Sequence, residues 1–160
     1  MNRRAQKTEK HDSYRTFERV QTEELDKLLD DCSNVEDFVR AQVAPYQGVD
    51  LPGYLTYLIE CKGLTRAEVI RRAGMSESYA YQIFAGEKQP SRDKLLALAV
   101  GVGMSADECR RALKLAGHSE LYIKNRRDAA IAFGLRRGLD VYDINDLLYQ
   151  MQEPILVSSK

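Results

Sequence analysis

The stretch TRAEVIRRAGMSESYAYQIFAGEKQPS (residues 65–91) contains two short amphipathic segments that meet at Gly74. Thr65 precedes the first segment and Glu68 stands three residues later, which is the spacing of a capping box. Glycine is the residue type that favours a left-handed turn, and Ser76 is a good N-cap for the second segment, residues 77–85. We therefore predict two helices across a tight turn. Helices of about eight residues are marginal alone, so neighbouring helices must support them.

The sequence on either side of this stretch supplies those neighbours. Apolar residues of LPGYLTYLIECKGL recur at helical spacing, and Gly63 is placed to end that helix. Ser91 opens a helix with the sequence RDKLLALAVGVG, and Ser105 opens another, ADECRRALKLAG, with Glu108 at the capping-box position. The order of these helices predicts a helix-turn-helix domain over residues 51–117. Its first, fourth and fifth helices would form the core that supports the short pair.

Two further helices are predicted beyond this domain, over residues 125–137 and 141–151. We expect residues 118–152 to pack on the domain as a helix pair and residues 153–160 to form a tail. The last helix carries an apolar stripe that is either core or the seam of a dimer. The stripe consists of Val141, Ile144, Leu147, Leu148 and Met151.

The N-terminal third has a different composition. Residues 1–15 are polar and charged, which predicts a disordered basic arm. Residues 16–50 predict an acidic helical extension: one helix ending near Cys32, a second over VEDFVRAQV, and a linker over residues 45–50. An alternating strand pattern is absent from the sequence, so the fold class expected for the whole chain is all-α.

The formal net charge of the 160 residues is zero, but the charge is unevenly distributed. Residues 20–50 carry a net charge of −6, whereas residues 110–137 carry +6. A neutral total can therefore conceal a basic face. That face could neutralise phosphates beside a DNA site, or the acidic N-terminal helices could dock on it, within one chain or across a dimer; the second is slightly favoured.

Other classes of protein have little support in the sequence. The three cysteines lack metal or disulfide spacing, so we expect free thiols in a reducing cytoplasm and neither a metal nor another cofactor. Apolar runs stay short of the ~18 residues of a membrane span, so no membrane association is expected. The two histidines belong to no catalytic arrangement, and an enzyme is not expected.

Between Leu51 and Cys109 the chain resembles the lambda-repressor-like (Cro/cI, XRE-type) helix-turn-helix family. The resemblance implies a four- to five-helix domain that binds double-stranded DNA, usually as a homodimer on a palindromic operator. The similarity extends without gaps through the LLALA run to Gly-Met-Ser. Its other landmarks are Thr65, Glu68, Val69, Gly74, Ser76, Ile83, Gly86 and Pro90-Ser91.

The resemblance also assigns roles to particular residues. It implies that bases are read by Glu77, Ser78, Tyr81 and Gln82. Arg66 stands at the family's helix-two start and Tyr79 on the recognition helix, and Lys88 and Arg92 follow that helix; these four are candidates for phosphate contacts. Gln82 can pair with adenine and Glu77 can accept from cytosine N4.

The chain departs from the family at two kinds of position. Ile70 stands where the family has a small residue and Ala80 where it has a bulky aliphatic, which we interpret as a volume-conserving exchange. The recognition helix lacks Lys and Arg and carries Glu77. Two functions remain open: a sequence-specific DNA-binding regulator, most simply a repressor, and an adaptor that binds a protein partner through its tyrosine-rich face.

Overall fold

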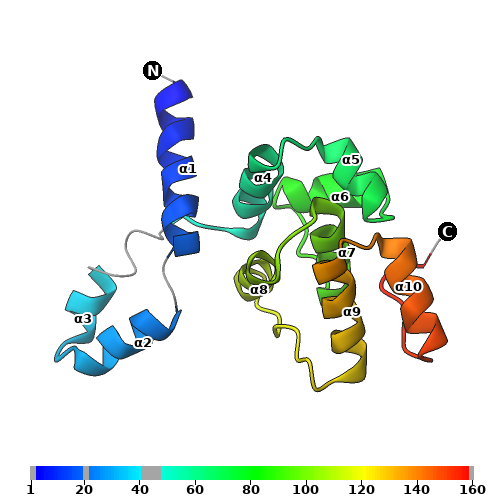
Figure 1. The fold of residues 1–160 in the computed structure, drawn as a ribbon. Helices are drawn as coiled ribbons and strands as arrows, with labels where there is room; N and C mark the ends of the chain where they lie inside the picture. The colour runs from blue at the N-terminus through cyan, green and yellow to red at the C-terminus, as the bar shows by residue number, and fades with distance from the viewer. Residues whose placement is uncertain (1–2, 20–21, 41–47, 159–160) are drawn as a thin grey trace. The chain divides into compact units, whose positions relative to one another are not determined.

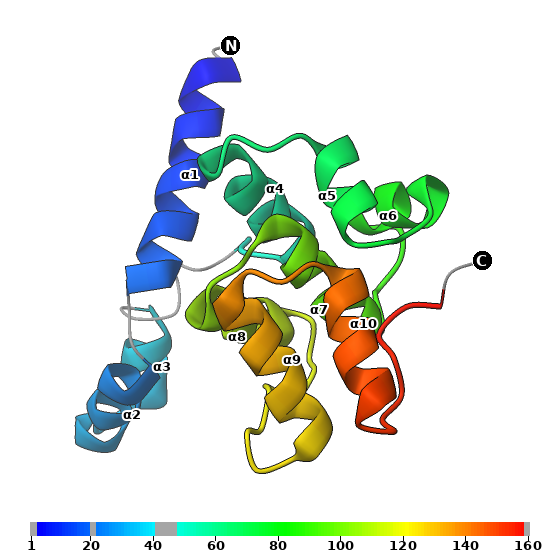
Figure 2. The same ribbon diagram turned by 45° about the vertical axis from the view of Figure 1, so that its right-hand side comes forward.

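The computed structural model describes residues 3–19, 22–40 and 48–158. Within these ranges all the regular structure is helical, in agreement with the predicted fold class. The chain divides into two compact units, residues 1–50 and 51–160. Figures 1 and 2 show the helices of each unit from two directions.

The described residues of the first unit form three helices, α1 (Arg3–Arg19), α2 (Thr22–Asp31) and α3 (Val35–Phe38). The expectation of a disordered arm over residues 1–15, followed by one helix from residue 16, differs from this structure. The Arg, Lys, Gln and Glu residues of α1 have good intrinsic helix propensity. The helix therefore forms although it has almost no apolar face. Residues 41–47 of the expected second helix and linker lie outside the described residues.

The described part of the second unit contains seven helices, and each of them contributes buried apolar side chains to the core. These helices are α4 (Leu51–Cys61), α5 (Arg66–Arg72), α6 (Glu77–Phe84), α7 (Arg92–Val102), α8 (Ala106–Leu115), α9 (Arg126–Arg137) and α10 (Val141–Gln150). Eight consecutive residues of α7, from Leu95 to Val102, are buried. A helix that is apolar all round belongs in a core, and α5, α8 and α10 pack against α7.

The contact between α5 and α7 depends on Gly101. A Cβ atom on Gly101 would lie only 2.5 Å from the carbonyl oxygen of Val69 and 3.1 Å from the Cβ of Ala73. The two helix backbones therefore approach more closely than any residue with a side chain would allow. Ile70 and Ala80, the exchanged pair, are both buried, with exposed fractions of 3% and 0%.

The helices α9 and α10 are part of the core of the second unit. Val141, Ile144 and Leu148 of α10 are fully buried, so these three stripe residues serve as core. The tail also packs, since Leu156 and Val157 are 4% and 5% exposed. In Figures 1 and 2, α10 lies beside α9, and the chain after α10 returns towards α6.

Two reciprocal ion pairs join the first turn of α7 to the first turn of α9, and we call them the Arg–Asp brace. Arg92 donates to both carboxylate oxygens of Asp128, at 3.0 and 2.8 Å. Arg127 donates to both carboxylate oxygens of Asp93, at 2.9 and 3.0 Å. Paired guanidinium–carboxylate hydrogen bonds of this kind are stronger and more directional than neutral ones.

The brace also holds two segments that have no regular structure. Arg92 donates to the carbonyl oxygens of Ser119 and Glu120, at 2.9 and 3.2 Å. Arg127 donates to the carbonyl oxygen of Pro154 at 2.8 Å. Four charged side chains thus connect α7 and α9 to the α8–α9 loop and to the tail.

The first prediction concerns Gly101. We expect Gly101→Ala to lower the free energy of unfolding by about 1–3 kcal/mol, because the added methyl group meets backbone that cannot move alone. Lys114→Ala in α8 is the control, because Lys114 is exposed and shortening its side chain creates no contact with buried backbone. Urea unfolding followed by circular dichroism measures both. Equal stability of Gly101→Ala and the natural chain would contradict the packing described for α5 and α7.

The second prediction concerns the brace. We expect Asp128→Asn to destabilise the chain by about 2–3 kcal/mol, because it leaves the guanidinium of Arg92 largely buried beside a neutral partner. Asp107→Asn is the control, since Asp107 forms an exposed ion pair with Arg110 and such pairs contribute about 0–1 kcal/mol. Urea titration of both variants distinguishes the two environments, and equal losses would show that the brace adds nothing beyond a surface pair.

The effect of Asp128 should depend on pH. Burial raises the pKa of Asp128, but hydrogen bonds from Arg92 and from the Tyr122 amide, with the charges of Arg92 and Arg127, outweigh burial and leave the pKa below its ordinary value. A carboxyl with a lowered folded-state pKa contributes stability above the unfolded value, about 3.9, and loses it as the pH falls through the folded value. The difference between the natural chain and Asp128→Asn should therefore shrink below about pH 4.

Candidate nucleic-acid interface

The short helices α5 and α6 are positioned by local hydrogen bonds that the sequence predicts almost completely. The Thr65 hydroxyl accepts from the Glu68 amide at 3.2 Å, and a Glu68 carboxylate oxygen accepts from the Thr65 amide at 2.8 Å. The hydrogen bonds that the Thr65 amide and the Thr65 hydroxyl donate to the Glu68 carboxylate hold the pKa of Glu68 below its ordinary value. The predicted capping box is therefore confirmed, and it defines where α5 begins.

The turn between α5 and α6 has the expected left-handed glycine. Gly74 has a φ angle of 61°, and the Met75 amide donates to the Ile70 carbonyl oxygen at 3.3 Å. Ser76 occupies the N-cap position with extended backbone, but its side chain makes no capping hydrogen bond. The prediction that Ser76 caps α6 is therefore right in position and wrong about the hydrogen bond.

The helix α6 is divided into a buried and an outward face. Ala80, Ile83 and Phe84 are buried, at 0%, 1% and 5% exposed. The outward face carries the side chains that the resemblance assigns to base reading. Glu77, Ser78 and Tyr81 are exposed and Gln82 is half-buried. The four predicted base-reading residues therefore lie together on one face of one helix, as a reading function requires.

One flank of this face is formed by Arg66 and two aromatic rings. The guanidinium of Arg66 lies 5.3 Å from the centre of the Phe84 ring, and the edge of the Tyr81 ring meets Phe84 with 6.4 Å between ring centres. A guanidinium held over an aromatic face is restrained without losing its charge. Arg66 is thus an exposed cation with a defined position at the start of α5.

The other flank is formed by Tyr79 and two lysines. The ammonium of Lys88 lies 5.4 Å from the centre of the Tyr79 ring, and that of Lys94 lies 5.9 Å from it. Sequence reasoning identified Lys88 and Tyr79 but missed Lys94. The sequence holds one signal that could have identified Lys94. It stands in the first turn of α7, where the helix dipole disfavours a cation, which indicates a role outside the helix.

Arg92 is the one predicted phosphate-contacting residue that the structure separates from this face. Its guanidinium is occupied by Asp128 and by two carbonyl oxygens of the α8–α9 loop. This role has no local signal in the sequence, because Asp128 lies 36 residues further along the chain. We therefore assign Arg92 to the brace and do not carry it into the proposed interface.

The electrostatics of the interface follow from these positions. The outward face of α6 is acidic or neutral, with Glu77 as its charged residue. The cations that border it, Arg66, Lys88 and Lys94, come from α5, from the segment after α6 and from α7. A surface with a polar centre and cations on both sides suits a duplex, because the base edges lie between two phosphate backbones.

The comparison with protein families agrees with this geometry. Residues 39–113 match the family model described as a helix-turn-helix domain, and this match includes α5, α6 and the turn between them. The match is consistent with the lambda-repressor-like type that the landmarks indicate. Neither the curated proteins nor the solved structures provide a match.

The residues that the structure describes contain neither a metal-binding cluster nor a membrane-spanning helix. Among them, groups of three or more His, Cys, Asp or Glu side chains that could hold a metal ion are not found. Helices long and apolar enough to cross a membrane are likewise not found in that part of the chain. Cys109 is buried, and burial raises the pKa of its thiol to about 11, so this cysteine is a packing residue.

Proposed function

We propose that the chain is a sequence-specific transcriptional regulator that binds double-stranded DNA by placing α6 in the major groove. The observation that carries this proposal is the outward face of α6, where four polar side chains lie together between cations on two flanks. In its simplest form the regulator is a cytoplasmic homodimer that represses by occupying a palindromic site. The DNA-binding domain is residues 51–117, with residues 118–152 packed on it and residues 153–160 as the tail.

The base-reading part of the proposal rests on hydrogen-bonding chemistry. The amide of Gln82 can pair with adenine N6 and N7 in the major groove, and the carboxylate of Glu77 can accept from cytosine N4. Ser78 can serve either donor or acceptor, and the Tyr81 ring supplies a flat contact surface with a hydroxyl at its end. The acidic residue therefore selects a base, although it is repelled by the phosphates.

The affinity in this proposal comes from the flanks. Arg66, Lys88 and Lys94 are the candidates for phosphate contacts, and Tyr79, between the two lysines, can contact sugar or phosphate. Both lysines pack against one ring, which limits the side-chain entropy that they lose on binding.

The second candidate function is a protein-interaction adaptor that uses the same scaffold. The observation that favours it is the exposed Tyr81, 43% exposed, on a helix face that lacks a cation of its own. Salt separates the two functions, because DNA binding weakens steeply with salt through counterion release, whereas an interface centred on tyrosine responds weakly.

The third prediction tests base reading. A site is first selected from a random duplex library with the purified chain. On that site we expect Gln82→Ala to cost about 1–3 kcal/mol and to relax the preference at one position of each half-site. Gln89→Ala is the matched control, since Gln89 is an exposed glutamine just beyond α6. Full affinity and unchanged selectivity of Gln82→Ala would remove Gln82 from the reading surface.

The fourth prediction tests the flanks. Replacing both Lys88 and Lys94 by Ala should lower the slope of log K against log salt by about 2, since each phosphate contact contributes about 0.9. The control replaces Lys114 and Lys124 by Ala. Both are exposed lysines of the positively charged residues 110–137 and lie outside α6. Fluorescence anisotropy at several salt concentrations gives both slopes. If the control pair changes the slope and the Lys88 and Lys94 pair does not, the phosphate contacts lie on residues 110–137.

A further inference from the structure

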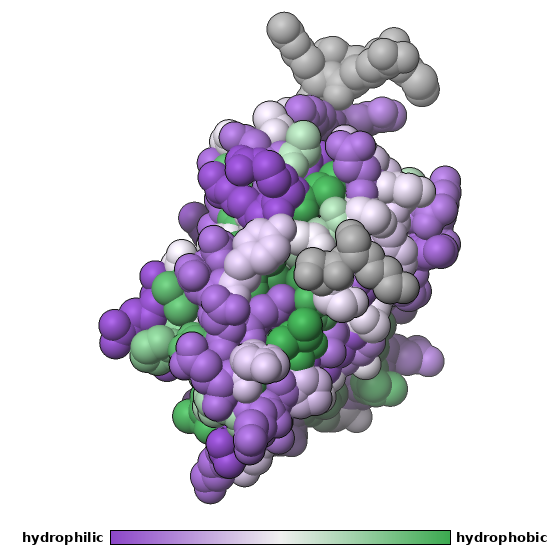
Figure 3. Space-filling model, turned by 90° about the vertical axis from the view of Figure 1, so that its right-hand side faces the viewer, coloured by the Kyte–Doolittle hydropathy of each residue, from purple (hydrophilic) through white to green (hydrophobic). Residues whose placement is uncertain are grey.

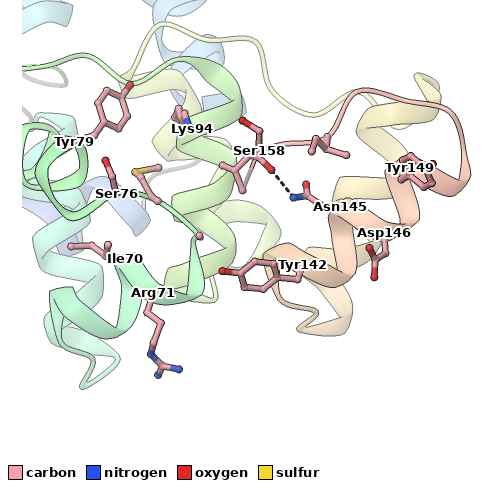
Figure 4. A pocket seen from close by; sticks show the side chains of 14 residues that line it. Ile70, Arg71, Ser76, Tyr79, Lys94, Tyr142, Asn145, Asp146, Tyr149 and Ser158 are labelled. Carbon is pink, nitrogen blue, oxygen red and sulfur yellow. Dashed lines mark hydrogen bonds between the residues drawn. The ribbon is translucent and has the colours of Figure 1, made fainter. Parts of the chain in front are cut away.

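The second unit has a groove beside the helix-turn-helix turn. It is a groove of about 960 Å³ between the turn, the first residues of α6, the start of α7, α10 and the tail. Its walls include Ser76, Tyr79, Lys94, Tyr142, Asn145 and Tyr149. Figure 3 shows this side of the molecule, where apolar surface is visible between hydrophilic side chains, and Figure 4 shows the lining residues. The volume lies at the upper end of the range for small-molecule sites, about 300–1,000 Å³.

One wall of the groove is held in place by Asn145 on α10. The side-chain amide of Asn145 donates to the Val157 carbonyl oxygen at 2.9 Å, the dashed line of Figure 4, and its side-chain oxygen accepts from the Leu156 amide at 2.8 Å. Arg127 holds the start of the same tail. A wall fixed by paired hydrogen bonds makes a largely pre-formed site, which loses little entropy on binding.

The aromatic side chains indicate one half of the ligand's chemistry. Tyr142 and Tyr149 line the groove although they are 55% and 78% exposed, and Tyr79 lines its opposite side. The floor between them is apolar and includes Ile70 and Met75. Three tyrosine rings along a lining that also has apolar residues suit an aromatic ligand, since ring pairs contribute beyond the area that they bury.

The charged side chains indicate the other half. In Figure 4, Arg71 and Asp146 point away from the groove at its rim, whereas Lys94 lies at its inner end near Ser76 and Tyr79. Lys94 has no acidic partner among the ion pairs of the described residues. The Ser76 hydroxyl is not used as a cap, so it can donate to a bound group. The inner end of the groove therefore favours an anion.

We propose that this groove binds a small anionic aromatic molecule, with its ring between the tyrosines and its carboxylate or phosphate group near Lys94 and Ser76. The ligand would also regulate the proposed DNA binding, and this part rests on the proposed function. Tyr79 and Lys94 belong both to the groove and to the flank of the α6 face. A ligand that engages them changes the cation available to phosphate and the position of α6.

The geometry of the turn gives this coupling a structural path. A Cβ atom on Gly74 would lie 3.2 Å from Val141 of α10 and 3.4 Å from Val157 of the tail. The turn that sets the angle of α6 is thus in contact with both elements that form the far wall. A ligand that shifts this wall must also shift the turn or resist its motion.

The binding test uses the full chain without DNA, so it does not depend on the proposed function. The probe is 2-naphthoate, and the readout is the ¹H–¹⁵N NMR spectrum. We expect saturable shifts at the amides of Gly74 and Ser76 and at the side-chain amide of Asn145. The neutral analogue 2-naphthylmethanol should bind about ten-fold more weakly, the size of one charge-assisted contact, and inorganic phosphate alone should not reproduce the shifts.

Variants localise the site. Lys94→Met and Tyr149→Ala should each weaken the binding of 2-naphthoate by about ten-fold. Lys114→Met and Tyr122→Ala, a lysine and an exposed tyrosine outside the groove, should leave it unchanged. All four chains are first checked for the natural circular dichroism spectrum. Shifts that do not saturate, or a saturable response that neither Lys94→Met nor Tyr149→Ala weakens, would overturn the site.

The coupling is tested on the selected DNA site. Saturating 2-naphthoate should change the DNA dissociation constant at least about three-fold in the natural chain and not in Tyr149→Ala, because linkage requires the ligand to bind. If 2-naphthoate binds the groove and the DNA affinity stays constant, the regulatory role is overturned. If the chain selects no DNA site while the NMR result holds, the proposed function fails and the binding site stands.

Discussion

The pairing of Arg92 with Asp128 and of Arg127 with Asp93 is the constraint on which the second unit depends. Each pair takes a residue from the first turn of α7 and one from the first turn of α9, so the two helices cannot slide past each other without breaking both. Two bidentate pairs in opposite directions also fix rotation, which a single pair would not. Asp128 is only 8% exposed. The energetic cost of burying it is offset because both oxygens of its carboxylate accept hydrogen bonds.

The brace makes the C-terminal helices a support for the helix-turn-helix turn. With α9 fixed to α7, α10 is held where Val141 contacts the backbone of Gly74. The tail is held in turn by Arg127 and Asn145, and its Val157 contacts the same glycine. The outer face of the α5–α6 pair is free. Without the contacts from α10 and the tail, this pair would rest only on α4 and α7. The angle of α6 is therefore set from both sides of the turn.

The parts of this structure that could be predicted from the sequence are those determined by local signals. The capping boxes at Thr65 and Ser105, the left-handed Gly74 and the apolar run of α7 each act within a few residues, and the structure has all of them. The four polar residues of the outward face of α6 were grouped through the family resemblance, and the structure places them on one side of the helix. The length of α1 was underestimated because polar residues suggested disorder, although their helix propensity is good.

The remainder depends on contacts between distant residues. Nothing within a few positions of Arg92 shows that its partner is Asp128, so a residue at a phosphate-contacting position was assigned to phosphate. Lys94 was not predicted, because its contact with Tyr79 joins two helices and forms only when α6 and α7 pack. The groove beside the turn needs α10 and the tail in place, and therefore could not be derived from the pattern of any one helix.

The distribution of charge at α6 has a consequence for how affinity and selectivity are combined. In a recognition helix with its own Lys or Arg, the same side chains attract phosphate and read bases. Here the helix carries Glu77 and neutral residues, while Arg66, Lys88 and Lys94 stand outside it. In the proposed function, attraction to the phosphate backbone and selection of bases would therefore come from different elements. Because Lys94 also lines the groove beside the turn, a change there would alter the proposed affinity for DNA while the proposed base-reading residues stay the same.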